Sequence, residues 1–221
     1  MARDRTIQTP WGGFTPAVEL FPLIYILVVY GFVYFLPFGI FRAWRVIGDD
    51  TPAEWLQFAA YFAAFLCSLR VLWMRRRSCW SLGWLSWLLM TLFCGYVSAE
   101  EISWGERLSG WGVGAIRAIN AQGETNLHNL PALQNYMHFS FIAIGLFFGY
   151  IGWRFLPAID ALPGRRFSLY FLIVALFYFY FDLSWMTLGE RIRNDQEVIE
   201  VLMAIGLFRH ASSKAFPAAK R

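Results

Sequence analysis

Charged residues are scarce in this sequence. They make up 15% of its 221 residues, whereas a typical soluble domain carries about a quarter. Apolar residues make up 58% of the chain. A chain with so few charges cannot cover an ordinary water-facing surface, so lipid must solvate most of it. The composition excludes a soluble globular domain and predicts an integral membrane protein.

The sequence also lacks the common signatures of metal sites and catalytic sites. Its three cysteines form no spaced pairs, and its three histidines show no HxxH or HExxH spacing. No serine stands in a nucleophile elbow, and no glycine-rich phosphate loop follows a strand. We therefore predict no metal, and no cofactor can be named. The alternative is a mixed site of His128 with carboxylates.

Five windows are long and apolar enough to cross about 30 Å of hydrocarbon as helices. They are 20–41, 55–74, 79–99, 136–156 and 167–188, and a shorter sixth candidate lies at 198–208. Every backbone polar group in lipid must be paired within its own segment. The fold class is therefore all-α, a single bundle of five or six transmembrane helices over residues 1–221. The short turn at 75–78 predicts that the helices on either side of it are antiparallel neighbours.

Basic residues cluster in three segments that would share one side of the membrane: 75–77, 154–166 and 209–221. The positive-inside rule places them in the cytoplasm together with the N-terminus. Most acidic residues then fall outside. The net charge of +4 and the pI near 9.1 reflect this topology and do not indicate nucleic-acid binding. We predict a multi-pass protein of the bacterial inner membrane.

The most polar stretch, residues 96–130, directly follows an apolar run and is predicted to lie at the outer interface. If the preceding helix continued through it, Glu100, Trp104 and Arg107 would share one face. Residues 105–114 contain four glycines, which predict that the helix breaks there instead. A short interfacial helix is expected at 113–120.

Four residues are candidates for catalysis: Glu100, Glu101, His128 and Asp182. Adjacent carboxylates in a pocket raise one pKa and can supply an acid beside a base, although a salt bridge at the helix end is the alternative. Asp182 lies at membrane depth, where an ionisable group either exchanges protons or pairs with a base. The predicted substrate-positioning residues are Trp104, Arg107, Asn126, Asn129 and Glu200.

Two motifs in the polar stretch resemble those of a known family. Residues 100–107 read EEISWGER and residues 122–129 read QGETNLHN. This pattern is similar to EEISWGQR followed by QGExNLHN, which occurs in an uncharacterised family of bacterial multi-pass membrane proteins. The resemblance implies membership and the location of a site, but no reaction. Glu106 stands where the family has glutamine, which adds a negative charge.

Three functions fit these observations. The first is an integral-membrane enzyme acting on a lipid or lipid-linked substrate, with Glu101 and Asp182 as acid and base. Alternatively, it is a non-enzymatic subunit or assembly factor, whose polar network locks the helices and presents a loop to a membrane protein partner. The third alternative is a small proton-coupled transporter. Membrane lipids are expected partners in each case.

Overall fold

The computed structural model describes residues 6–9, 12–35, 52–188 and 196–217. A hairpin of β1 (Ile7–Thr9) and β2 (Gly12–Phe14) precedes the helices. The helices are α1 (Pro16–Glu19), α2 (Phe21–Phe35), α4 (Pro52–Met74), α5 (Leu82–Glu101), α6 (Glu106–Ser109), α7 (Gly114–Arg117), α8 (Gln134–Leu146), α9 (Gly152–Phe155), α10 (Ser168–Leu188) and α12 (Gln196–Ala215). A π turn, Phe147–Ile151, joins α8 to α9.

The all-α prediction is confirmed for the described residues, apart from the hairpin, which the sequence did not indicate. Three helices there are long and apolar enough to cross a membrane: Pro52–Met74, Leu82–Glu101 and Tyr136–Phe155. Window 20–41 is helical to Phe35, and its remainder lies outside the described residues. Window 198–208 was too short, because the helix there, α12, has 20 residues.

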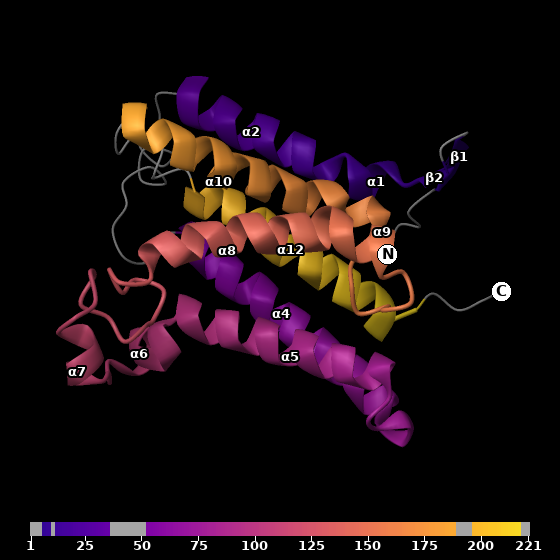
Figure 1. The fold of residues 1–221 in the computed structure, drawn as a ribbon, viewed down its shortest axis with the longest axis horizontal. Helices are drawn as coiled ribbons and strands as arrows, with labels where there is room; N and C mark the ends of the chain where they lie inside the picture. Colours follow the sequence, from indigo (N-terminus) through magenta and orange to yellow (C-terminus); the bar gives the residue numbers. More distant parts are fainter. Residues whose placement is uncertain (1–5, 10–11, 36–51, 189–195, 218–221) are drawn as a thin grey trace.

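Helix α12 lies at the centre of the bundle (Figure 1). It packs against α4 on one side and α10 on another, while α5 packs on α4 and α8 packs on α10. Its small and aliphatic side chains from Val201 to Ala215 include many of the most buried in the protein. Burial of such apolar area is the main stabilising term in soluble cores, whereas close packing and hydrogen bonds dominate in lipid. Because α5 packs on α4 and α8 packs on α10, these two outer helices are both held in place through α12.

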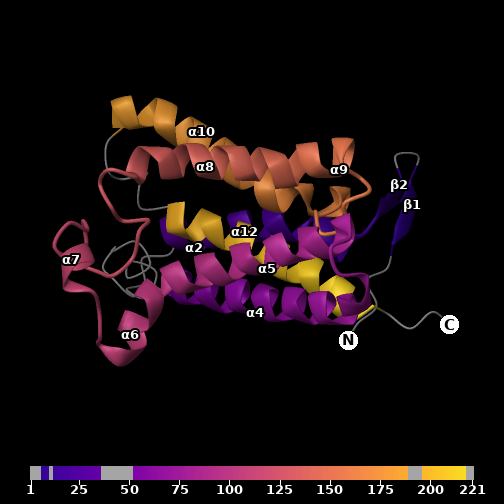
Figure 2. The ribbon, with the colours of Figure 1, turned by 60° about the horizontal axis from the view of Figure 1, so that its bottom comes forward.

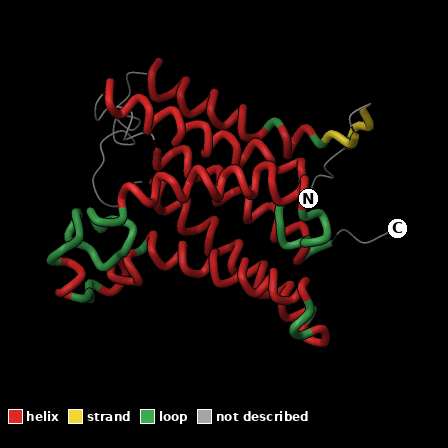
Figure 3. The backbone as a smooth tube through the Cα atoms, in the orientation of Figure 1, coloured by secondary structure: helices red, strands yellow, loops and turns green. Residues whose placement is uncertain are grey.

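The three basic segments meet at one end of the bundle. Arg75 in the α4–α5 turn bonds Asp160 in the α9–α10 loop, and Lys214 Nζ lies 3.9 Å from the same carboxylate. Arg70 Nε donates to the Ala215 carbonyl at 3.1 Å. Figures 2 and 3 show the long 102–133 connection at the opposite end. The charge separation expected from the sequence is therefore present, while its orientation in a membrane stays a prediction.

Two glycines, one in α8 and one in the π turn that continues it, allow this part of the chain to approach α10 closely. A Cβ at Gly145 would lie 2.8 Å from the Phe171 carbonyl oxygen, and one at Gly149 would lie 2.8 Å from Leu172 Cγ. Their spacing is the small-xxx-small pattern that permits close helix contact in lipid. Sequence reasoning did not single them out, although the pattern is visible. They fix α8, and with it one wall of the site described below.

Gly145→Ala should destabilise the protein by about 1–3 kcal/mol, the usual cost of overpacking, because the new methyl group would meet backbone that cannot rotate away. Gly31→Ala is the matched control, since a Cβ there meets nothing within 4 Å. Thermal unfolding in detergent measures both. Equal midpoints for the two variants would show that α8 and α10 do not depend on this approach.

Candidate functional site

Helix α5 ends at a strained turn. Ser103, Trp104 and Gly105 have φ values of 49°, 56° and 87°, and the left-handed region costs a residue with a side chain roughly 1–2 kcal/mol. Ser103 is buried, and its hydroxyl donates to Glu124 Oε2 at 2.5 Å. The helix thus ends at Glu101, and the carboxylate of Glu100 bonds the loop that follows. The glycine-rich stretch 105–114 predicted a break in the helix, and the observed break begins a few residues earlier, with Gly105 as its last left-handed residue.

Arg107 joins the loop to the bundle. Its Nη1 donates to Glu54 Oε2 at 2.5 Å, and its Nη2 donates to Glu124 Oε1 at 3.1 Å. Only 7% of its side chain is exposed. Burial disfavours the charged guanidinium, but the two carboxylates outweigh this effect and raise the pKa of Arg107 above its ordinary value. The first turn of α4, α6 and the 120–130 segment are therefore held together by one cation.

Glu100 holds residues 126–129, which read NLHN, against the end of α5. Its Oε2 accepts from the backbone N–H groups of Leu127 at 2.7 Å and His128 at 3.0 Å, and it lies 3.3 Å from His128 Nδ1. Its Oε1 accepts from Trp104 Nε1. A carboxylate with so many donors is well placed as an anchor. Its predicted acid or base role stays a prediction.

Asn126 is fully buried behind this anchor. Its Nδ2 donates to Glu124 Oε2 at 2.7 Å, and its Oδ1 accepts from Asn120 Nδ2 at 2.8 Å. Every one of these bonds lies within the loop, so the contacts support the shape of the loop. Asn129 instead lines the cavity described next, and its Nδ2 donates to Gln122 Oε1.

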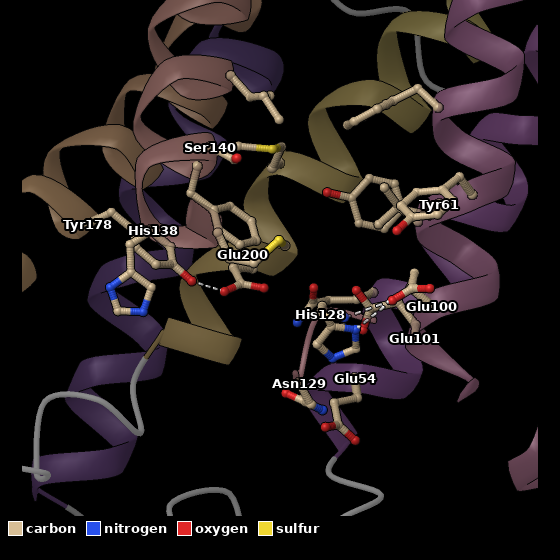
Figure 4. A pocket seen from close by; sticks show the side chains of 18 of the residues that line it. Glu54, Tyr61, Glu100, Glu101, His128, Asn129, His138, Ser140, Tyr178 and Glu200 are labelled. Carbon is tan, nitrogen blue, oxygen red and sulfur yellow. Dashed lines mark hydrogen bonds and ion pairs between the residues drawn. The ribbon is translucent and has the colours of Figure 1, made fainter. Parts of the chain in front are cut away.

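A cavity of about 340 Å³ opens between α5 and α8 beneath this loop. Figure 4 shows its polar end, with the α5 carboxylates on one wall and Glu200 on the facing wall. The rest of the lining is mainly apolar, with Gln57, Tyr61 and Ser140 among its polar members. The apolar lining residues are Phe93, Val97, Met137, Phe141, Ile144 and Met203. The cavity is therefore amphiphilic, with its charged end at the loop.

Titratable groups face the cavity from two sides. On one side Tyr178 donates its hydroxyl proton to Glu200 Oε1, and the His138 ring packs edge-on against Tyr178 with centroids 5.5 Å apart. On the other side lie Glu101 and the buried Tyr61. Tyr178 was not predicted, because nothing in its aromatic run separates it from lipid-facing neighbours.

The structure brings six of the predicted site residues to this cavity: Glu100, Glu101, Arg107, His128, Asn129 and Glu200. Trp104 is 54% exposed and is not among the lining residues, and Asn126 lies behind the loop. The side chain of Asp182 falls outside the described residues. Within the described part of the chain, no group of three or more histidine, cysteine or acidic side chains could hold a metal ion.

Comparison of the chain with models of protein families, with curated proteins and with solved structures gave no match. The site is therefore interpreted from its own geometry. The likeness to the family of multi-pass proteins stays a prediction.

Arg107→Gln should destabilise the protein by about 3–5 kcal/mol, because it leaves two buried carboxylates without their cation. Arg117→Gln is the control in the same loop. Its partner is Glu106, its side chain is 38% exposed, and such pairs contribute about 0–1 kcal/mol. Thermal unfolding and protease sensitivity of the 103–130 segment would report both. Similar losses in the two variants would contradict the central role of Arg107.

Glu106 gives this loop a pH dependence. Its Oε2 accepts from Thr125 N at 2.7 Å and its Oε1 pairs with Arg117, and these contacts outweigh its desolvation and lower its pKa. A carboxylate with a lowered folded-state pKa stabilises the fold above its unfolded pKa of about 4.3 and loses that contribution as pH falls through the folded value.

Hydrogen exchange in residues 106–125, corrected for intrinsic rates, should therefore accelerate as pH is lowered from 6 to 3. In Glu106→Gln the acceleration should be weaker, because the amide does not titrate. An identical pH profile in the two proteins would assign the acid sensitivity to another group.

Proposed function

We propose that this chain is an integral-membrane enzyme acting on a lipid or lipid-linked substrate. The observation that carries the proposal is the amphiphilic cavity between α5 and α8, charged at the loop end and apolar beyond it. Its volume lies within the range of roughly 300–1,000 Å³ typical of small-molecule sites. Five or six membrane crossings, a bacterial inner-membrane location and an outward-facing loop are part of this proposal, as is membership of the multi-pass family.

The substrate would enter with its headgroup toward the loop. Phe93 and Val97 from α5 and Ile144 from α8 line the apolar part of the cavity, and in this proposal an opening between the two helices leads from it to the bilayer. An acyl or isoprenoid chain suits this path, because apolar contact along it replaces contact with lipid tails. The cavity is small for a whole lipid, so most of the chain would stay in the membrane.

Two carboxylates are placed to move protons at the headgroup. Glu101 at the end of α5 and Glu200 on α12 line the same cavity from opposite walls. A pair of carboxylates in distinct surroundings can serve as general base and general acid. Tyr178 positions Glu200 through its hydroxyl. We assign Glu200 a role that was predicted from the sequence for Asp182, whose side chain lies outside the described residues. His128 and Asn129 would contact the headgroup.

A non-enzymatic subunit is the second candidate, and one observation favours it. The loop segment exposes large apolar side chains, including Trp104, Leu108, Trp111 and Ile119, with Trp111 76% exposed. Together with the Arg107 network, this surface could present the loop to a membrane protein partner. The same side chains would also suit an interfacial position, where tryptophan is enriched.

Glu101→Gln should abolish lipid conversion while leaving the protein folded and at normal abundance, because the amide keeps the shape but cannot accept the proton. Lipid composition would be compared in a strain lacking the protein and in strains complemented with wild type, Glu101→Gln or Glu200→Gln. Glu106→Gln is the control, since it lies in the same polar segment but outside the cavity lining. It should restore the wild-type lipid profile.

Two results would contradict the proposal that the protein is an enzyme. One is an unchanged lipid profile in the deletion strain. The other is isolation of the protein in fixed ratio with another membrane protein, with Glu101→Gln lowering only its abundance. Native mass spectrometry of protein released in mild detergent separates these cases, because it reports lipids and protein partners in one spectrum.

A further inference from the structure

We propose that a second cavity, at the opposite end of the bundle, binds the phosphate headgroup of an anionic phospholipid. This cavity has a volume of about 370 Å³ and lies among the 156–164 loop, the start of α10 and the end of α12. It shares no lining residue with the cavity beneath the polar loop. The proposal therefore rests on the proposed insertion in a membrane but not on the proposed enzyme activity.

The cavity carries excess positive charge. Its lining includes three cations, Arg165, Arg166 and Lys214, and one carboxylate, Asp160, which gives a net charge of +2. Asp160 is already engaged, because Arg75 Nη1 donates to its Oδ1 at 3.0 Å and Trp87 Nε1 donates to the same atom at 3.3 Å. Asp160 is therefore fixed by these bonds. Its negative charge is offset by Arg75, which does not line the cavity.

The remaining lining suits an amphiphile better than a free anion. Trp153, Leu156, Ile159 and Leu162 form an apolar wall beside the cations. Leu156 and the neighbouring Phe155 are exposed. A phosphate monoester or diester could meet the arginines while its glycerol and first methylene groups contact this wall.

The position of the cavity also fits a headgroup. Its lining includes the 156–164 loop, which lies at the end of the bundle opposite the 102–133 connection (Figure 2). Basic pockets between helices at the cytoplasmic surface are known to bind anionic headgroups. The buried His210 closes the floor, with its Nε2 3.0 Å from the Ala161 carbonyl and its ring stacked on Trp87. The cavity floor is therefore held by fixed contacts.

The test is native mass spectrometry of the full chain in mild detergent with added phosphatidylglycerol or phosphatidylethanolamine of the same acyl chains. Wild type should retain phosphatidylglycerol preferentially. Arg165→Gln/Arg166→Gln should weaken that retention roughly 30-fold, since each basic residue near an anionic headgroup contributes about fivefold. The matched control is Arg76→Gln/Arg77→Gln, which removes two exposed arginines from the turn at the same end, outside the cavity.

Thermal unfolding would confirm that both double variants are folded. If the cavity variant is not folded, Arg165→Gln and Arg77→Gln form a second matched pair. Three outcomes overturn the proposal: wild type retains both lipids equally, the two matched variants lose phosphatidylglycerol equally, or inorganic phosphate displaces the lipid at equal concentration. The last outcome would make this a site for a soluble phosphate.

Discussion

The structure depends on one buried cation. Arg107 in α6 pairs with Glu54 at the start of α4 and with Glu124 in the loop. Two parts of the polar segment that are separated in the sequence are therefore fixed to α4. Without that cation, the carboxylates would be left together in a poorly solvated place. The strained Ser103–Gly105 turn and the bond from Leu127 N to Glu100 depend on this pairing, because both require the loop to return over the end of α5.

This arrangement divides the acidic residues into two groups. Glu54, Glu100, Glu106 and Glu124 bond arginines, backbone N–H groups or tryptophan and so shape the loop. Glu101 and Glu200 line a common cavity from two helices, and Glu54 and Glu100 line it as well. The acids that shape the loop and the two that we propose act on a substrate therefore share one cavity, and the sequence alone does not separate them.

The helical fold followed from composition and from runs of apolar residues, because lipid leaves a chain few other ways to pair its backbone. The glycines at 105–114 predicted a break, and α5 ends just before them, at Glu101. Six of the predicted site residues line one cavity, but the pairings around it were not predicted: nothing local shows that Asn126 points into the loop or that Tyr178 meets Glu200, 22 residues away. Long-range pairing of this kind leaves no trace in a single sequence. The N-terminal hairpin was also missed, because its strands have three residues each.

The central place of α12 has a consequence for biosynthesis. Helices α4, α5, α8 and α10 precede it in the chain, yet α4 and α10 both pack against it. In the membrane insertion that we propose, these helices are synthesised before α12, so the middle of the bundle stays unfilled until α12 joins them. Glu200 arrives with this helix, so the cavity gains this carboxylate after Glu54, Glu100 and Glu101. Nascent chains that end before α12 would therefore lack one wall of the cavity.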